Sequence, residues 1–469
     1  MTIEHEFADV VIIGAGVVGC ALARRLARSD LSVLVLEARG DVGDSTSKAN
    51  TAILHTGFDT VPGSLESTLV AKGAHELRRY AEAAGIALEE TGALLVAWNE
   101  EQEAALEGLK EKAERNGYRA AALLDADEVR RREPNLGPDA RGGLSIPDEA
   151  IIDPWSVTLA FATEAVSAGA RFRFHARVTG ISAHGERHRI ELDSSETVGA
   201  TWLINAAGLG AGVLDGLVGH DDFTVTPRRG QLLVYDKLAR PLLSSIILPV
   251  PTERTKGVLV SPTVWGNLLV GPTAEDLEDP TDTATTEEGI ASLRAAAARL
   301  LPALAKEELT AAYAGLRAAT EHRDYQITID GPSRYVCVGG IRSTGLTASL
   351  AIAEHVAEQL RHEGLVVGER EGLAGPPTMP PLGERQLRPL FDDARIQGNS
   401  AYGRAICHCE RVSEGEVVDA LRSVIPARDL GALRRRTRAM NGRCQGFYCG
   451  GAVQRLLESS VERLGEEQP

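Results

Sequence analysis

The stretch that decides the fold lies near the start of the chain, Asp9-Val-Val-Ile-Ile-Gly14-Ala-Gly16-Val-Val-Gly19. A run of β-branched residues leads into three glycines at G-x-G-x-x-G spacing. The alanine- and leucine-rich segment 21–29 follows, and a second apolar run, Leu31–Glu37, ends on a carboxylate. This order of strand, glycine turn, helix and strand predicts the first βαβ unit of a dinucleotide-binding fold.

Each glycine of the turn has a physical task in such a unit. Gly14 allows the tight turn, Gly16 lets a pyrophosphate approach the backbone, and Gly19 lets the helix pack close to the strand. The N–H groups at the helix N-terminus favour phosphates, and Glu37 can accept hydrogen bonds from ribose hydroxyls. A bare G-x-G-x-x-G would be weak evidence, whereas the complete unit predicts that the protein binds a dinucleotide.

Composition and charge exclude several classes of protein. The chain has 469 residues, 43% of them hydrophobic and 25% charged, which suits a globular protein with about three domains. Its formal net charge of −16 argues against a nucleic-acid partner and against general affinity for anionic membranes. The start, Met1–Phe7, shows no apolar signal segment, and no apolar run approaches the ~18 residues of a spanning helix. We therefore expect a cytoplasmic protein that meets a membrane only peripherally, at its inner face, or through a partner subunit.

Three separated segments predict one cofactor-binding layer. They are Asp9–Glu37, Thr201–Gly208, and Arg334–Gly340 with the helical pattern that follows it. Residues 64–134 are rich in Ala, Glu, Leu and Arg and indicate helices, whereas residues 223–275 alternate like strands. We expect a cofactor domain that is interleaved with a mixed substrate domain.

A change of composition marks the boundary of a last domain. The segment Ala374-Gly-Pro-Pro-Thr-Met-Pro-Pro381 cannot continue a helix, so we expect an extended linker at 371–400 and a compact unit at 401–465. The expected larger unit spans 1–370, with its cofactor layer at about 5–75, 150–215 and 330–365 and its substrate domain at about 76–149 and 216–329.

The six cysteines are unevenly placed. Cys20 and Cys337 lie in apolar segments and are expected to be small core residues. The remaining four crowd into the last 65 residues. No export signal accompanies them, so a metal site explains them better than disulfides do. They form a C-x-C…C-x4-C set of Cys407, Cys409, Cys444 and Cys449.

Four thiolates can hold a tetrahedral zinc ion or both irons of a [2Fe–2S] cluster. C-x-C spacing is less usual for zinc, which favours two to four intervening residues. A cluster with four thiolates carries a formal charge of about −2, and the arginines of 434–438 and Arg443 lie close in sequence. Such cations would raise its potential. A solvated helix face is the alternative explanation of the basic run, and zinc remains the alternative metal.

Two further segments favour FAD over NAD as the dinucleotide. Asp44–Asn50 puts hydroxyl and amide side chains just beyond Glu37, where ribityl and pyrophosphate oxygens need donors. Gly339-Gly340, with Thr344–Thr347 opening a helix, can aim N–H groups at the pyrimidine edge of a flavin, where reduction places negative charge. Caps and turns without a ligand are the alternative explanation of either segment.

With these residues, segment 5–365 resembles the D-amino-acid-oxidase/glycerol-3-phosphate dehydrogenase superfamily of FAD enzymes. The matching stretches are Val10–Gly19, Thr46–Asn50, Ile53–Gly57, Asn205–Gly208, Gly315–Arg317 and Gly339–Thr347. The resemblance implies an α/β fold with a Rossmann-like FAD-binding domain of D-amino-acid-oxidase type and an interleaved α+β substrate domain. It implies an extended FAD bordered by Gly14, Gly16, Gly19, Glu37, Ser47, Asn50, Gly208, Gly340, Thr344 and Leu346.

The cysteine segment resembles a second family, the bacterioferritin-associated-ferredoxin-like [2Fe–2S] domain. The match covers Ile406–Cys409, the capping-box start Ser413–Glu416 of a helix, and Arg435–Cys449. It implies a small C-terminal helical domain that holds a [2Fe–2S] cluster through the four cysteines. A flavin domain joined to this tail is a feature of the anaerobic-type glycerol-3-phosphate dehydrogenase large subunit.

Three residues are candidates for the chemistry. His55 resembles the histidine that lies against the flavin in this superfamily and would orient the substrate or move its proton; a structural histidine is the alternative. Arg317 matches an arginine that binds the substrate's anionic group. Arg323 resembles a second phosphate-binding arginine, with a surface salt bridge as the alternative. Two departures are Arg342, where the glycerol-phosphate branch often has lysine, and His55–Phe58, which is closer to the L-2-hydroxyglutarate branch.

The resemblance implies an FAD/[2Fe–2S] dehydrogenase that converts sn-glycerol 3-phosphate into dihydroxyacetone phosphate. The flavin would accept a hydride from this small anionic substrate, and the cluster would pass single electrons to a quinone or a redox protein subunit. A 2-hydroxyacid, a secondary amine or an opine, with its carboxylate at Arg317, is the alternative substrate. An electron-transfer subunit with an inactive substrate pocket is the alternative of a different class.

Overall fold

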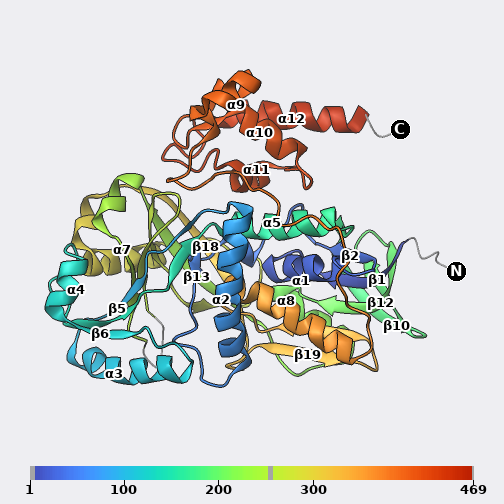
Figure 1. Cartoon of the computed structure of the whole chain (residues 1–469), viewed down its shortest axis with the longest axis horizontal. Coiled ribbons are helices and arrows are strands. Elements are labelled where there is room, and N and C mark those ends of the chain that lie inside the picture. The colour runs from blue at the N-terminus through green and yellow to red at the C-terminus, as the bar shows by residue number, and fades with distance from the viewer. Residues whose placement is uncertain (1–5, 252–256, 467–469) are drawn as a thin grey trace.

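The computed structural model describes residues 6–251 and 257–466, and it shows an elongated body with a smaller domain above it (Figure 1). The body has two halves, each built on one large sheet. The domain above it contains the C-terminal helices (Figure 1).

The first large sheet lies in the half of the body that bears the N-terminus (Figure 1). Its eight strands in the described ranges are β1 (Glu6–Ile13), β2 (Val33–Leu36), β9 (Arg171–Arg173), β10 (Val178–His184), β11 (Arg187–Leu192), β12 (Thr197–Asn205), β19 (Gln326–Asp330) and β20 (Tyr335–Gly339). β1 pairs in parallel with β2 on one side and with β12 on the other, and β12 pairs in parallel with β20. The three apolar segments singled out in the sequence therefore lie side by side.

Helices cover this sheet closely. α1 (Val17–Ala27) packs against α5 (Pro154–Ser167) and α8 (Gly345–His362), and α8 packs against α2 (Leu65–Ala84); α6 (Ala211–Leu217) follows β12. Cys20 of α1 and Cys337 of β20 are fully buried, so their expected role as core residues is confirmed.

The second large sheet forms the other half of the body. Its nine strands in the described ranges are β5 (Ala93–Ala97), β6 (Ala122–Asp125), β7 (Gly142–Ile146), β13 (Thr226–Tyr235), β14 (Ile246–Pro249), β15 (Leu259–Pro262), β16 (Leu268–Gly271), β17 (Glu275–Asp276) and β18 (Leu309–Ala319). β13 and β18 pair antiparallel along nearly their whole length. The helices of this half are α3 (Glu100–Arg115), α4 (Ala126–Arg132) and α7 (Glu287–Leu300).

A small third sheet places the end of β3 (Ile53–Leu54) beside the start of β8 (Ala150–Ile152), next to the site. β8 pairs with β3 and with β4 (Leu88–Glu89). Because β3 and β8 run antiparallel, the end of β3 and the start of β8 meet at one edge.

The C-terminal domain contains a short hairpin and small helices. These are β21 (Ala405–Cys407), β22 (Val412–Ser413), α9 (Asp393–Gly398), α10 (Glu414–Arg422), α11 (Leu430–Thr437) and α12 (Gly450–Glu466). The predicted capping box at α10 is confirmed, since Ser413 Oγ accepts from the Glu416 N–H (3.3 Å) and Glu416 Oε2 accepts from the Ser413 N–H (2.8 Å).

The connection before this domain differs from the expected extended linker in its last part. Residues 371–388 contain no helix or strand, as expected, but α9 follows within the segment. Asp392 accepts hydrogen bonds from the Ala394 and Arg395 N–H groups, which stabilises this short helix.

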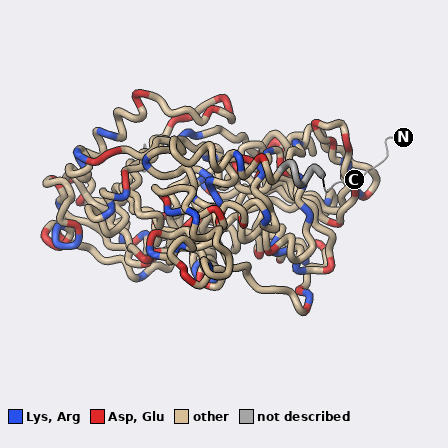
Figure 2. The backbone as a smooth tube through the Cα atoms, turned by 90° about the horizontal axis from the view of Figure 1, so that it is seen from above, with Lys and Arg blue, Asp and Glu red and all other residues tan. Residues whose placement is uncertain are grey.

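Acidic and basic residues are interspersed along the backbone (Figure 2). The net charge of −16 is therefore spread over the chain rather than gathered in one tail. Among the residues that the structure describes, no helix combines the length and the apolar character needed to cross a membrane.

Candidate flavin site and cysteine centre

The turn after β1 is packed so closely that glycine is required. Gly14 has a φ of +104°, and a Cβ there would lie 2.6 Å from the carbonyl oxygen of Ala206. A Cβ at Gly19 would lie 1.9 Å from the carbonyl oxygen of Gly14. Only glycine fits both positions. α1 can therefore begin immediately behind β1, as the motif predicts.

Ser47 and Glu37 border this turn from two sides. Gly16 is the N-cap of α1 and brings no side chain, and Ser47 Oγ accepts the N–H of Val17 at 3.0 Å instead. Glu37, at the end of β2, accepts the N–H of Ala15 at 2.7 Å. A hydroxyl at the helix N-terminus and a carboxylate beside the turn suit a pyrophosphate and a ribose.

Asn50 closes the loop that follows β2. Its amide donates to the carbonyl of Ser47 (2.8 Å) and accepts the N–H of Ala52 (2.8 Å). Its own carbonyl accepts the hydroxyl of Tyr313 on β18 at 3.0 Å. The side chain of Asn50 therefore orders the loop, and its backbone ties the loop to the second sheet.

The N-cap residue of α8 is Thr344, and its side chain does not accept a hydrogen bond from the backbone N–H groups of the first turn. The hydroxyl of Thr344 donates to Glu66 Oε1 (2.7 Å) and shares a hydrogen bond with the Tyr325 hydroxyl (2.6 Å). Gly340, with a φ of +66°, turns the chain after β20, and Leu346 is partly buried against the core. An uncapped helix N-terminus favours an electron-rich ligand edge.

Gly208 lies just beyond β12 with a φ of +59°. A Cβ there would meet nothing within 4 Å among the described atoms, so the backbone borders open space. The site therefore combines glycine turns beside open space with two helix N-termini that are not capped by their own N-cap residues. Together these features form a cradle that fits FAD.

His55 directly follows β3, and a buried carboxylate holds its ring. The His55 Nδ1 lies 3.0 Å from Glu149 Oε2; the Glu149 side chain is fully buried, while that of His55 is 23% exposed. Oε1 of Glu149 accepts the N–H (2.7 Å) and the hydroxyl (3.0 Å) of Thr56. The backbone N–H of His55 donates to Thr347 on α8 at 3.0 Å.

This pairing defines how His55 can act. An ionised Glu149 keeps a proton on Nδ1, so the neutral ring has its lone pair on Nε2 and can take up a proton there. The sequence analysis missed Glu149. The only signal was an acidic residue directly before the apolar strand β8, and the adjacent Asp148 gave the same signal.

Arg317 lies on the face of β18 that meets the flavin-binding loop. Tyr313 contacts Asn50 as described above, and a Cβ at Gly315 would lie 2.3 Å from the carbonyl oxygen of Ala49. Because side chains alternate along a strand, Arg317 shares the face of Tyr313 and Gly315. The sheet therefore presents a guanidinium beside the loop.

The electrostatics of Arg317 favour an anionic ligand. In the part of the chain that the structure describes, no carboxylate pairs with it, and Arg228 is its cross-strand neighbour. Arg228 itself pairs with Asp276 (2.5 Å). Burial first, and then the charge of Arg228, lower the pKa of Arg317. An anion bound there would relieve both effects.

Arg323 is placed differently from Arg317. It lies exposed in the turn after β18, and its carbonyl accepts a hydrogen bond from Arg342. Arg342 also lies 3.8 Å from Glu66. Across the described ranges, no hydrogen bond or ion pair joins Arg323 to Arg317, so its role in binding a phosphate stays a prediction.

The four cysteines of the C-terminal domain lie close enough to one another to interact electrostatically. Burial first, and then the neighbouring Cys444, raise the pKa of Cys409, and burial followed by the neighbouring Cys407 raises that of Cys449 to about 12. Within the described residues, no three His, Cys, Asp or Glu side chains converge as a single-ion site. Four neighbouring thiols without a compact single-ion site among the described residues suit two irons, each with two thiolate ligands, better than they suit one zinc ion.

The surroundings of the cysteines supply donors and positive charge. Backbone N–H groups, that of Tyr448 foremost, lower the pKa of Cys444. The guanidinium of Arg443 interacts electrostatically with Cys409, and that of Arg434 with Cys449. These groups fit an anionic cluster.

The basic run 434–438 is not a solvated helix face, which corrects one of the two explanations given above. Arg436 and Arg438 are each only 4% exposed. Arg435 and Arg436 pair with Asp41 of the body, and Arg438 pairs with Glu410. Arg435 and Arg436 therefore join the two domains, which sequence spacing alone could not reveal.

Comparisons with known proteins agree with this geometry. Residues 9–359 match the family model of the FAD dependent oxidoreductases, and residues 405–459 match that of the BFD-like [2Fe-2S] binding domain. The chain is therefore an FAD-dependent oxidoreductase, and its C-terminal domain is a [2Fe–2S]-binding domain. It belongs to the D-amino-acid-oxidase family of flavoproteins, with FAD and a [2Fe–2S] cluster as its cofactors.

Three relatives show how far the similarity extends. The chain is 34% identical over 465 residues to a glycerol 3-phosphate dehydrogenase of Caloramator mitchellensis, which covers 98% of this chain and 95% of that one. It is 27% identical over 501 residues to the anaerobic glycerol-3-phosphate dehydrogenase subunit A1 of Haloferax volcanii, over 94% of this chain and 81% of that one. A solved L-alpha-glycerophosphate oxidase of Mycoplasma pneumoniae with FAD bound has a TM-score of 0.75 and 30% identity, over 80% of this chain and 99% of that one.

Proposed function

We propose that this enzyme oxidises sn-glycerol 3-phosphate to dihydroxyacetone phosphate, with electrons leaving through the [2Fe–2S] cluster to a quinone or a redox protein. The observation that carries the substrate assignment is Arg317, a half-buried guanidinium beside the flavin-binding loop without a carboxylate partner in the described structure. A phosphate or a carboxylate can pair with such a group through bidentate hydrogen bonds. The names of the two dehydrogenases described above support the same substrate.

Oxidation of the secondary alcohol requires a hydride acceptor and a proton acceptor. FAD supplies a hydride acceptor, and the [2Fe–2S] cluster supplies a one-electron carrier. His55 takes the hydroxyl proton at Nε2, and the buried Glu149 stabilises the resulting imidazolium. Arg317 holds the phosphate through bidentate hydrogen bonds and so orients the reacting carbon.

Steady-state assays of purified enzyme with an artificial electron acceptor test the substrate. We expect turnover of sn-glycerol 3-phosphate and far slower turnover of glycerol, which lacks the phosphate. Arg317→Met should lower kcat/KM for the phosphorylated substrate by about 10- to 100-fold, as the loss of charge-assisted hydrogen bonds does. Since glycerol has no group for Arg317, its kcat/KM should hardly change.

Arg189→Met is the matched control. Arg189 lies on β11 of the first sheet and pairs with Glu191 (3.7 Å), so its loss should leave both substrates unaffected. Turnover of L-2-hydroxyglutarate or an opine, without turnover of sn-glycerol 3-phosphate, would contradict the proposal. A flavin that no hydroxy or amino compound reduces would instead indicate an electron-transfer subunit.

A further inference from the structure

Side chains from three parts of the chain meet between the flavin-binding loop (Asp44–Asn50) and the cysteine loop (Cys407–Glu410). Trp155 lies in the first turn of α5, Trp265 lies in the turn between β15 and β16, and Arg438 is the C-cap of α11. The two indole rings stack with centroids 4.5 Å apart and an interplanar angle of 27°. The Cζ of Arg438 lies 4.4 Å from the ring centroid of Trp265 and 5.8 Å from that of Trp155.

One end of this stack is fixed to the flavin-binding loop. Trp155 Nε1 donates to the carbonyl oxygen of Lys48 at 3.0 Å, and Lys48 directly follows Ser47. The backbone of Trp155 is held as well, since its N–H donates to the fully buried Asp153 at 3.0 Å. The indole is therefore anchored at both its backbone and its ring nitrogen.

The other end of the stack is fixed to the cysteine loop. Arg438 Nε donates to Glu410 Oε2 at 3.0 Å, and each side chain is 5% exposed. Glu410 directly follows Cys409, a cluster ligand. Lys237 of the body contacts the same carboxylate oxygen at 3.3 Å. Contacts thus run without interruption from Lys48 through both rings and the guanidinium to the residue beside the cluster.

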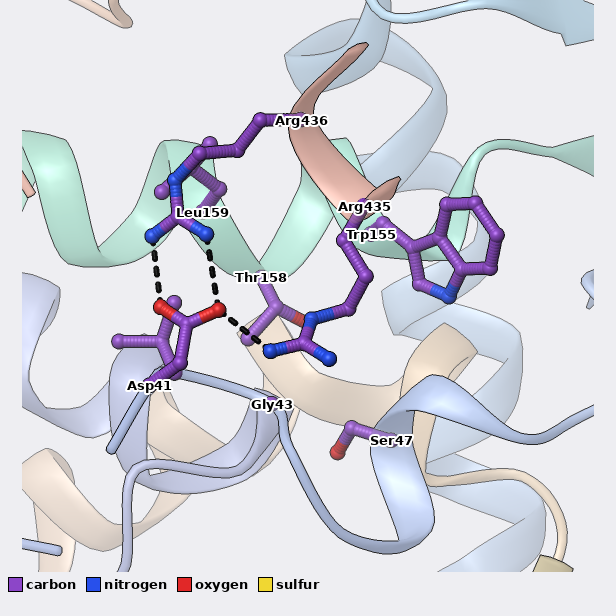
Figure 3. Close-up of a pocket in the computed structure, with 9 residues that line it drawn as sticks. Asp41, Gly43, Ser47, Trp155, Thr158, Leu159, Arg435 and Arg436 are labelled. Carbon is purple, nitrogen blue, oxygen red and sulfur yellow. Dashed lines mark hydrogen bonds and ion pairs between the residues drawn. The ribbon is translucent and has the colours of Figure 1, made fainter. Parts of the chain in front are cut away.

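A separate group of ion pairs holds the two domains together beside the stack. Arg436 donates to both oxygens of the buried Asp41 (2.8 and 2.6 Å), and Arg435 donates to Asp41 (2.5 Å) and to Asp44 (2.8 Å). Figure 3 shows the pairing of both arginines with Asp41, with Trp155 and Ser47 close by. Only about 10 Å³ of space remains between these residues. The aromatic stack shares no side chain with these ion pairs, so it is a separate contact between the two domains.

We propose that Trp155, Trp265 and Arg438 are positioning residues that hold the cysteine loop and the flavin-binding loop in one fixed contact. The rate of electron transfer falls steeply as the gap between donor and acceptor widens. The stacked aromatic rings fill the space between the two loops at van der Waals distance. The inference concerns the two cofactor-binding loops and does not depend on which substrate reduces the flavin.

Three variants of the full holoenzyme separate positioning from docking. Trp265→Leu removes the stacked ring and leaves every ion pair of the interface in place. Trp265→Phe keeps a stacking ring and serves as the conservative rescue. Arg438→Met removes both the cation over the rings and the pair with Glu410, whereas Arg404→Met, the matched control, breaks an exposed pair with Glu414 (2.7 Å) elsewhere in the domain.

The readout is the EPR signal of the reduced cluster in freeze-quenched samples after photoreduction of the flavin with EDTA as the sacrificial electron donor, which needs no substrate. We expect Trp265→Leu to slow its appearance by about tenfold, equivalent to ~1.4 kcal/mol on the barrier. Trp265→Phe should restore most of the rate. In both Trp265 variants, reduction of the cluster by dithionite should match the wild type, and so should the rate of trypsin cleavage within 371–400. In Arg438→Met, reduction by dithionite should again match the wild type, but trypsin cleavage within 371–400 should be faster.

Two results would overturn the inference. An unchanged rate in Trp265→Leu would show that the ring does not matter for the contact between the loops. Equal slowing in the Leu and Phe variants, together with increased cleavage within 371–400 in both, would show that Trp265 only stabilises the docked domain. Failure of sn-glycerol 3-phosphate as a substrate would leave these outcomes unaffected, since EDTA supplies the electrons in this experiment.

Discussion

The two cofactor-binding regions of this chain are built in opposite ways. The flavin cradle is made by backbone, at glycines such as Gly14 and Gly340 from opposite ends of the larger unit. The cysteine centre is made by side chains within one short segment, and Phe447 and Tyr448 beside it are 83% and 81% exposed. An interior cradle suits hydride transfer, which benefits from exclusion of water, and a surface centre suits delivery of electrons to an external acceptor. Substitutions in one region should therefore remove its own cofactor and leave the cofactor of the other region bound.

The largest effect is expected from breaking the flavin side alone. In Gly19→Ala the new methyl group would meet the carbonyl oxygen of Gly14 at 1.9 Å, so the strand and α1 must separate. We expect loss of FAD, and with it all activity, and destabilisation by about 3 kcal/mol in urea unfolding. Iron content per folded chain should stay at the wild-type level.

Gly108→Ala is the control for this substitution. Gly108 lies within α3, and a Cβ there meets nothing within 4 Å among the described atoms. Alanine should stabilise this helix by about 0.5–1 kcal/mol and leave FAD bound. Full FAD content in Gly19→Ala would show that the close approach of α1 to β1 is not needed.

The converse variant breaks the cysteine side alone. Cys407→Ser removes a predicted cluster ligand whose side chain is only 1% exposed. We expect loss of the cluster, measured as iron content and EPR signal, with FAD still bound and still reduced by substrate. Cys20→Ser, in the core of the body, should keep the iron. Loss of FAD together with iron in Cys407→Ser would contradict the independence of the two regions.

A smaller effect is expected at the interface that joins them. Asp41→Asn leaves Arg435 and Arg436 without their shared carboxylate, so we expect destabilisation by about 3 kcal/mol in urea. Burial opposes ionisation of Asp41, but the hydrogen bonds from both arginines hold its pKa below the usual value. The contribution of Asp41 to the free energy of unfolding is therefore complete above pH ~4. It is lost as the pH falls through the lower pKa of the folded state.

The pH dependence gives this prediction its check. The difference in unfolding free energy between wild type and Asp41→Asn should shrink as the pH falls below ~4. Glu414→Gln, which breaks the exposed pair with Arg404, should cost only about 0.5 kcal/mol. A cost for Asp41→Asn as small as this control would mean that the interface ion pairs do not hold the domain.

The smallest effect is expected at His55. Glu149→Gln keeps an oxygen that can accept the Nδ1 proton but removes the charge that stabilises the protonated ring. We expect kcat to fall by about tenfold with little change in KM, because Glu149 does not touch the substrate. Asp148→Asn, at the exposed neighbouring position, is the control. An unchanged kcat in Glu149→Gln would remove the pair from proton transfer.

The motifs that sequence analysis found are those in which neighbours along the chain make the geometry. The glycine turn and the C-x-C…C-x4-C set have their spacing in the primary structure, so fold and cofactor class were predictable. The contact between His55 and Glu149 depends on the pairing of β3 with β8, across 94 positions. A local sequence pattern cannot predict a contact between residues so far apart in the chain.

The same reason explains the misread basic run. Arginines beside cysteines suggested either neighbours of the cluster or a solvated face, but Arg436 lies 395 positions from its partner Asp41. Trp155 and Trp265 gave no signal at all, since a tryptophan that begins a helix is most often a core residue. The helix α9 was missed because it is short and lies next to a proline-rich segment.

Anaerobic addition of sn-glycerol 3-phosphate to the purified holoenzyme tests the central claim most directly. The account predicts that the flavin absorbance bleaches and that the EPR signal of the reduced cluster then appears, with about two irons per chain. Bleaching by L-2-hydroxyglutarate or an amine, with no response to sn-glycerol 3-phosphate, would contradict it. A flavin that bleaches while the cluster stays oxidised would contradict the link between the two regions.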